Sequence, residues 1–141
     1  MQPWLIYALL SAFFAALTTI FAKAGLKDVN SDLATAIRTT IVVVITWAIV
    51  FFRYRNVNLS SLSKNNWIYL VLSAIATGAS WIFYYHALQI GKTAEVSVID
   101  KSSLALVILF SFIFLSEPLT LKVVVSGGLV LAGMMVLVLW K

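Results

Sequence analysis

Five apolar runs, each 20 to 23 residues long, take up most of this 141-residue chain. They cover residues 4–24, 33–52, 67–89, 94–116 and 121–140, and short polar segments connect them. An α-helix rises 1.5 Å per residue, so about 20 apolar residues cross the roughly 30 Å of hydrocarbon in a bilayer. Because lipid offers no hydrogen bonds, each segment has to satisfy its own backbone as a helix. The sequence therefore predicts an all-α fold: a polytopic membrane helix bundle of five transmembrane helices, in a single domain over residues 1–141.

Composition indicates the same class and excludes several functions. Hydrophobic residues make up 62% of the chain and charged residues 11%, against roughly 45–50% and about 25% in soluble domains. There is no cysteine and His86 is the only histidine, so we expect no disulfide, no metal site and no cofactor. The formal net charge is +5, but the basic residues lie mostly in short connections, where they meet lipid headgroups. We therefore expect the lipid bilayer, and no nucleic acid, as a partner.

Local signals predict where the helices begin and end. Pro3 stands at a position typical of a helix start, and Gly25 is the expected C-cap of the first helix. Ser31 or Asp32 is the expected N-cap of the second helix, and Thr120 that of the fifth. The first run is longer than the apolar part of a secretory signal and follows no Lys or Arg, so we predict a retained helix.

Five crossings place the two termini on opposite sides of the membrane, and the basic residues do not decide the orientation. The N-terminal side receives four of them: Arg53, Arg55, Lys64 and Lys122. The other side receives six: Lys23, Lys27, Arg38, Lys92, Lys101 and Lys141. Of these, Lys23, Arg38 and Lys101 are expected inside the membrane. The basic 53–66 loop favours an inside N-terminus. The near balance also fits dual topology, in which two copies pair antiparallel as inverted repeats, and both alternatives stay open.

Four charged residues are expected within the membrane: Lys23, Arg38, Asp100 and Lys101. Each costs roughly 2.5–3.5 kcal/mol on insertion scales, so a function is the default hypothesis. All four are expected near the same side of the membrane, as a cluster of formal charge +2. Such a cluster suits the carboxylate or phosphate group of a substrate. Asp100 is also a candidate for proton uptake. Adjacent helical residues do not face each other, so we expect Asp100 to face a cation on another helix or a watery cavity. The alternative is a charge network that locks helices together, or a positive collar beside the headgroups.

The third run adds a polar and aromatic face. Three- and four-residue spacing places one polar stripe on it, formed by Ser73, Thr77, Ser80 and Tyr84. Trp81 lies deep enough to bind an amphiphilic or ring-bearing solute, and His86 is a candidate proton relay. The alternative is an aromatic belt at the membrane interface. The candidate substrate-binding or coupling residues are therefore Asp100, Lys101, Arg38, Trp81, Lys23 and His86.

Three segments of the second half form a recognisable pattern. They are ALQIG at 87–91, VIDKSS at 98–103 and FLSEPLT at 114–120, and a glycine-rich last helix follows them. The pattern resembles EamA-type domains of the drug/metabolite transporter superfamily, most closely the small five-helix bacterial/archaeal branch. The resemblance covers essentially the whole chain and is most specific over residues 87–133. It implies transport of a small metabolite by alternating access across the cell (inner) membrane.

The chain departs from related domains at several points. Common EamA halves have Leu-Gly-Glu before the last helix, where this chain has Leu115-Ser116-Glu117. Longer relatives carry two such domains and ten helices. Small multidrug relatives have four helices and depend on a first-helix glutamate, whereas no acidic residue lies between Met1 and Lys27. A proton–drug exchange through such a glutamate is therefore not expected.

The sequence leads to one main hypothesis and two rivals. We predict a secondary transporter or exporter of a small-molecule metabolite, not an enzyme, that works as a homodimer because one five-helix domain is half of a ten-helix carrier. The alternative is a non-transporting membrane subunit that associates with another membrane protein. An intramembrane enzyme that depends on His86 or Asp100 is the third hypothesis, and no nucleophile–base motif favours it.

Overall fold

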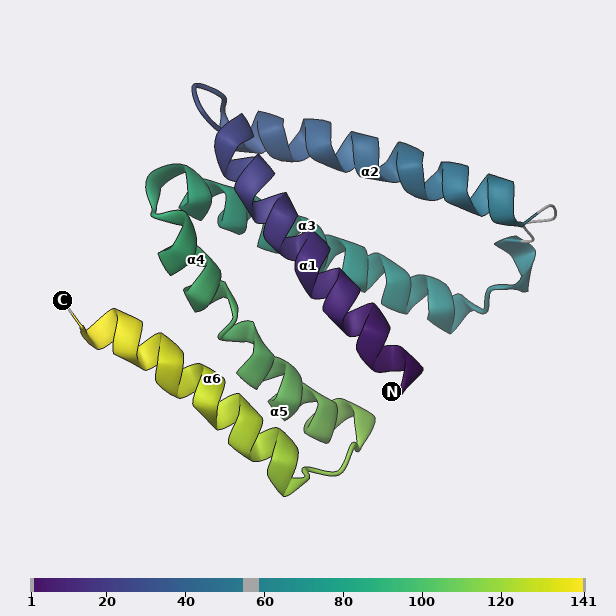
Figure 1. Ribbon diagram of the computed structural model, residues 1–141. Helices are drawn as coiled ribbons and strands as arrows, with labels where there is room; N and C mark the ends of the chain where they lie inside the picture. The colour runs from purple at the N-terminus through teal and green to yellow at the C-terminus, as the bar shows by residue number, and fades with distance from the viewer. Residues whose placement is uncertain (1, 55–58, 141) are drawn as a thin grey trace. The chain divides into compact units, whose positions relative to one another are not determined.

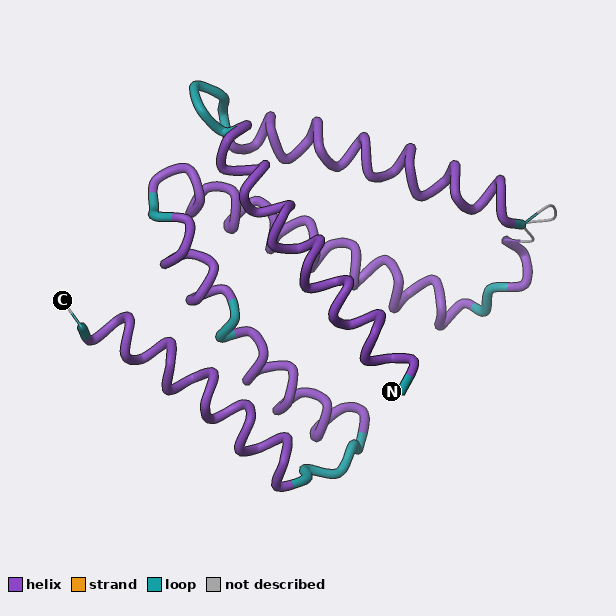
Figure 2. The backbone as a smooth tube through the Cα atoms, in the orientation of Figure 1, coloured by secondary structure: helices purple, strands orange, loops and turns teal. Residues whose placement is uncertain are grey.

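The fold consists of helices that match the predicted spans (Figures 1 and 2). The computed structural model describes residues 2–54 and 59–140. Its elements are α1 (Pro3–Gly25), α2 (Ser31–Arg53), the 3-10 turn η1 (Leu59–Ser61), α3 (Lys64–Ile90), α4 (Thr93–Asp100), α5 (Ser103–Leu115) and α6 (Leu121–Leu139). Five spans are long and apolar enough to cross a membrane, with α4 and α5 together forming one of them. No strand occurs in these two ranges, so the all-α fold is confirmed.

The helix ends follow local chemistry, with two corrections. The C-cap of α1 is Leu26, so the prediction of Gly25 is wrong. α1 begins at Pro3, and the Thr120 hydroxyl accepts a hydrogen bond from the third residue of α6, as predicted. The N-cap of α2 is Asn30, so the prediction of Ser31 or Asp32 is wrong. The Asn30 backbone is extended, and its side-chain oxygen accepts from the N–H groups of Asp32 and Leu33 at 2.8 and 3.2 Å. An asparagine in this conformation satisfies two of the free N–H groups at a helix start.

Contacts divide the chain into two compact units, Met1–Ile90 and Gly91–Lys141. In the first unit α3 contacts both α1 and α2, and α1 crosses α3 (Figure 1). The buried side chains of this unit lie near the α1–α2 connection and the end of α3: Leu26, Ser31, Thr35, Tyr85 and Leu88. Most large apolar side chains elsewhere are exposed, as expected where lipid tails replace a packed core.

The fourth span is not one regular helix. The N–H groups of Lys101 and Ser102 bond to carbonyls three residues earlier, at 3.2 and 2.9 Å, and those of Leu104 and Ala105 do the same. This local 3-10 spacing separates α4 from α5. The Ser103 hydroxyl donates to the Asp100 carbonyl at 2.8 Å, which compensates for the tighter turn. The VIDKSS segment therefore forms a break inside a membrane span, a feature that transporters use near their binding sites.

Helix α5 ends in a left-handed residue. Ser116 has φ 55° and ψ 29°, and the Glu117 N–H bonds to the Ser111 carbonyl at 3.3 Å. Glycine adopts this conformation without the steric cost that a Cβ atom brings. Ser116 stands at the step where the resemblance leads us to expect glycine, and its left-handed backbone is strained.

Replacing Ser116 with glycine is expected to stabilise the protein by about 0.5–1 kcal/mol, because the left-handed strain is larger than the entropy that glycine adds. Thermal unfolding in detergent measures the change. Ser126→Gly in the middle of α6 is the control, and it is expected to destabilise by a similar amount. A midpoint for Ser116→Gly at or below that of the unaltered protein contradicts the assignment of strain.

In the second unit α5 and α6 approach each other closely at Gly127. A Cβ atom there would lie 2.6 Å from the Ile108 Cδ1 atom, whereas one at Gly128 meets nothing within 4 Å. We expect Gly127→Val to destabilise by about 1–3 kcal/mol through overpacking. Gly128→Ala is expected to be neutral or stabilising by up to about 1 kcal/mol, since alanine favours helix. Equal effects of the two substitutions on the thermal midpoint would contradict this packing.

Charges at the membrane faces bear on orientation. Arg55 and Lys141, two residues of the predicted charge balance, lie outside the described residues. Lys92 precedes α4 and binds Glu95 at 2.9 Å. That hydrogen bond raises the pKa of Lys92 above its usual value of 10.5. Lys92 is therefore positively charged at neutral pH and counts as one full charge when the basic residues on the two sides of the membrane are compared.

Candidate functional site

A groove of about 750 Å³ lies between α2 and α3 of the first unit. Its lining runs from Asp32 to Val44 on α2 and from Leu70 to Ile82 on α3. Each stretch is 13 residues, or roughly 18 Å of helix, which is more than half of the hydrocarbon thickness. The polar lining side chains come from both helices: Asp32, Thr35, Thr39, Thr40, Ser73, Thr77 and Trp81. The groove has the volume of a small-molecule site and mostly apolar walls.

The threonine hydroxyls of the groove use their protons on their own helices. Thr35, Thr39 and Thr40 donate to the carbonyl oxygens four residues earlier, at 2.8, 2.7 and 3.0 Å. Thr77 does the same on α3 at 2.8 Å. A threonine hydroxyl has one proton and two lone pairs. These four oxygens therefore offer only acceptor lone pairs to a molecule in the groove.

Arg38 stacks on aromatic rings next to this groove. Its guanidinium carbon lies 4.2 Å from the centroid of the Trp81 ring and 5.7 Å from that of the Tyr85 ring. Tyr85 is buried. The Arg38 Nη1 atom is also buried and has no hydrogen-bond partner in the described part of the chain. The structure thus brings together Arg38 and Trp81, two of the predicted site residues, and leaves one N–H donor of the guanidinium unused.

Lys23 and His86 lie near the α1–α2 connection. The Lys23 ammonium donates to the Leu88 carbonyl in the last turn of α3, where helix carbonyls lack partners within the helix. The His86 Nδ1 atom is 3.5 Å from the Ser31 hydroxyl, a long contact for a hydrogen bond. The lysine contact supports the structural alternative, in which Lys23 ties α1 to α3. The proton-relay role of His86 stays a prediction.

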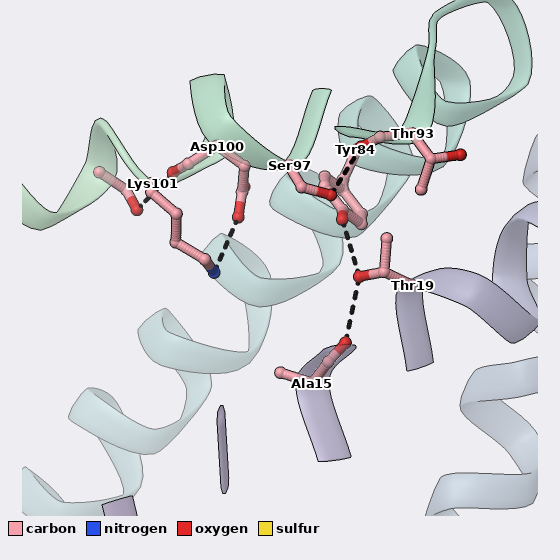
Figure 3. Close-up of polar contacts among 8 residues, drawn as sticks. Ala15, Thr19, Tyr84, Thr93, Ser97, Asp100 and Lys101 are labelled. Atoms are coloured by element: carbon pink, nitrogen blue, oxygen red, sulfur yellow. Dashed lines mark hydrogen bonds and ion pairs between the residues drawn. The ribbon is translucent and has the colours of Figure 1, made fainter. Parts of the chain in front are cut away.

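The polar stripe of the third span divides between two neighbours. Ser73 and Thr77 line the groove beside α2. Tyr84 instead approaches α1, with its hydroxyl 2.9 Å from the hydroxyl of Thr19 (Figure 3). Thr19 in turn donates to the Ala15 carbonyl at 3.1 Å. Because α1 crosses α3, the polar stripe lies beside α2 at Ser73 and Thr77 and beside α1 at Tyr84.

Asp100 and Lys101 pair with each other, which corrects the prediction that these adjacent residues do not pair. The Lys101 ammonium lies 3.5 Å from the Asp100 carboxylate (Figure 3). The prediction was wrong because it considered only Cβ directions, whereas the lysine stem is long enough to bend back at the end of α4. The pair is partly exposed and weak. A cluster of all four membrane charges stays a prediction, since these two residues belong to the second unit and Lys23 and Arg38 to the first.

Sequence reasoning did not select Thr35, Thr39 and Tyr85, which the structure places at or beside the groove. The available signal was the four-residue spacing of the two threonines, which puts them on one face of α2. Tyr85 is 4% exposed and packs beside Arg38.

Known proteins are similar to this chain over nearly all of its length. Residues 2–139 match the family model of the EamA-like transporter family. A Sinorhizobium protein described as "Uncharacterized transporter in cobO 3'region" is 42% identical over 136 residues, or 96% of each chain. An uncharacterised protein of Methanocaldococcus jannaschii is 28% identical over 137 residues, or 97% of each chain. No solved structure matches. With its five apolar helices, the chain is a multi-pass membrane protein that belongs to the EamA-like transporter family.

Proposed function

We propose that this chain is a secondary transporter that carries a small metabolite across the cell (inner) membrane by alternating access. The observation that carries the proposal is the α2–α3 groove, which combines hydroxyl oxygens, a carboxylate and a tryptophan in helices long enough to span the membrane. Polar groups in a span are costly. Their gathering on the facing sides of two helices is what a path for a polar solute requires. Membership of the EamA-like transporter family supports the same function.

Within this proposal Trp81 contacts the solute. Its ring lines the groove, and Arg38 holds the ring from the side by a cation–π contact at 4.2 Å. The Arg38 Nη1 atom beside the ring is buried and has no hydrogen-bond partner in the described part of the chain. Arg38 is therefore a positioning residue for Trp81.

The second unit supplies the coupling and movement in this scheme. Asp100 and Lys101 lie at the break between α4 and α5, where three-residue hydrogen bonds replace the regular helical ones. Protonation of Asp100 would release Lys101 from the ion pair. Coupling of transport to this pair, with Lys23 and His86 as further candidates in the first unit, completes the proposed residue set.

We propose that the working assembly is a homodimer. An odd number of spans and a nearly balanced distribution of basic residues fit two copies inserted in opposite directions, which together form inverted repeats. The two relatives match over 96% and 97% of their own lengths, so they too carry one such unit. An antiparallel pair is thereby the simplest route to a ten-helix carrier.

Tags on both termini test this assembly. The proposal predicts that each terminus is found on both sides of the membrane and that crosslinking of tagged copies gives homodimers that contain both orientations. A single orientation with parallel crosslinks would contradict the antiparallel pair. Co-purification of a different membrane protein, with no homodimer, would favour the non-transporting subunit instead.

Uptake into proteoliposomes tests transport itself. A panel of radiolabelled amino acids, amines, carboxylates and sugar phosphates is offered to the purified protein in liposomes. We expect saturable uptake of at least one class above that of empty liposomes. No uptake in either direction across the whole panel would contradict the proposed function.

A further inference from the structure

We propose that the α2–α3 groove recognises the protonated amine of a small amphiphilic solute, an inference that rests on the proposed transport function. Among the polar lining side chains of the described residues, acceptors outnumber donors, and the Ser73 hydroxyl and the Trp81 Nε1–H are the groups able to donate. Four lining hydroxyl groups have their protons committed to helix carbonyls, which leaves only their lone pairs for a ligand: Thr35, Thr39, Thr40 and Thr77. An ammonium group has three donors and no acceptor, which is the complement of such a surface.

Charge favours the same class of ligand. Among the described residues that line the groove, only Asp32 is charged. Its backbone N–H is bonded to Asn30, whereas its carboxylate has no ion pair or hydrogen bond in the described part of the chain. Charge-assisted hydrogen bonds are about twice as strong as neutral ones. A free carboxylate at the end of a row of acceptors therefore selects a cation over a neutral or anionic group.

A cation lies near the groove but not in its lining. Arg38 is not part of the groove lining, and its guanidinium is stacked on Trp81 and Tyr85. The rest of the lining is apolar and includes Val43, Leu70 and other aliphatic side chains. Such walls fit a hydrocarbon or aromatic body, which gives the full ligand class: an amine on a small apolar frame.

Three probes of similar shape test the inference on the purified full-length protein: 2-phenylethylamine, 2-phenylethanol and 3-phenylpropanoate. Calorimetry in detergent measures their affinities, and proteoliposomes measure their uptake. We expect the amine to bind roughly tenfold or more tightly than the alcohol or the carboxylate. Asp32→Asn is expected to abolish that advantage. Asp28→Asn is the matched control, because Asp28 precedes α2, is absent from the lining, and has a φ of 61° that asparagine tolerates.

The hydroxyl row is tested at Thr39. Thr39→Val keeps the shape and removes the lone pairs, so amine affinity is expected to fall several-fold, and Thr39→Ser is expected to restore it. Thr46→Val is the control on the same helix, since Thr46 also bonds to a carbonyl four residues earlier but lies outside the groove lining.

The outcomes separate this inference from the proposed function. Uptake of the alcohol or the carboxylate that matches or exceeds uptake of the amine, with no effect of Asp32→Asn, overturns amine recognition and leaves transport standing. Asp32-dependent binding of the amine without uptake of any solute supports the amine site and contradicts transport. Absence of saturable binding by all three probes also overturns the inference.

Discussion

Replacing Trp81 with alanine is expected to lower the transport efficiency, which is the maximal rate divided by the apparent KM, by about ten- to a hundredfold. The ring forms part of the groove wall and is half-buried. A tryptophan buries about 150–250 Å² on contact, and even half of that area at about 25 cal/mol per Å² corresponds to roughly 2–3 kcal/mol. The loss should fall on solute affinity first, because the ring contacts solute and not a reacting atom. Uptake into proteoliposomes as a function of solute concentration separates the apparent KM from the maximal rate.

Trp47→Ala is the matched control for this prediction. Trp47 is a tryptophan of the neighbouring span that stacks on Phe51 at 5.5 Å and does not line the groove. It should leave the apparent KM unchanged. Equal uptake by Trp81→Ala and the unaltered protein would remove Trp81 from the solute path.

Arg38→Met is expected to reduce transport at least tenfold while leaving the thermal midpoint unchanged or higher. The substitution removes the cation–π contacts to Trp81 and Tyr85, worth about 2 kcal/mol when desolvated. It also removes a charge from a membrane span, which costs roughly 2.5–3.5 kcal/mol on insertion scales. The second figure is the larger, so stability alone does not account for the arginine. We therefore expect a functional role for it.

Two measurements distinguish this role from a structural one. Arg38→Lys keeps the charge but loses the planar stacking on the rings, so we expect partial transport activity from it. Arg38→Met with normal uptake and a lower thermal midpoint would mean that the arginine serves only to fasten α2 to α3.

The spans were predictable because hydrophobic length alone determines them. A bilayer imposes the same requirement on every segment, and the helix ends follow from residues such as Pro3 and Thr120. In the structure, the ALQIG segment has a packing role. Leu88 is fully buried, and the Gln89 amide donates to the Val29 carbonyl at 2.8 Å, so this turn ties α3 to the α1–α2 connection.

The groove was not predictable because it depends on which helix faces become neighbours. Thr35 and Thr39 form an unremarkable pair on α2 until Thr77 of α3 is placed opposite them. The helix break was hidden for another reason. Residues 100–103 predicted a polar site but not a break, because the change to three-residue hydrogen bonding is a backbone property that side-chain patterns do not specify.

The central claim is that water and solute enter the α2–α3 groove, and one measurement tests it without a known substrate. The chain contains no cysteine, so a single introduced cysteine reports only on its own position. Thr39→Cys lies in the groove lining, whereas Ile41→Cys, two residues further on α2, replaces an exposed apolar side chain outside it. Both are treated with a charged, membrane-impermeant thiol reagent, added separately to each side of sealed membranes.

Alternating access predicts that Thr39→Cys reacts from both sides and that Ile41→Cys, facing lipid, reacts from neither. A Thr39→Cys protein as unreactive as Ile41→Cys would mean that the groove is closed to water, and the account of transport through it would fail.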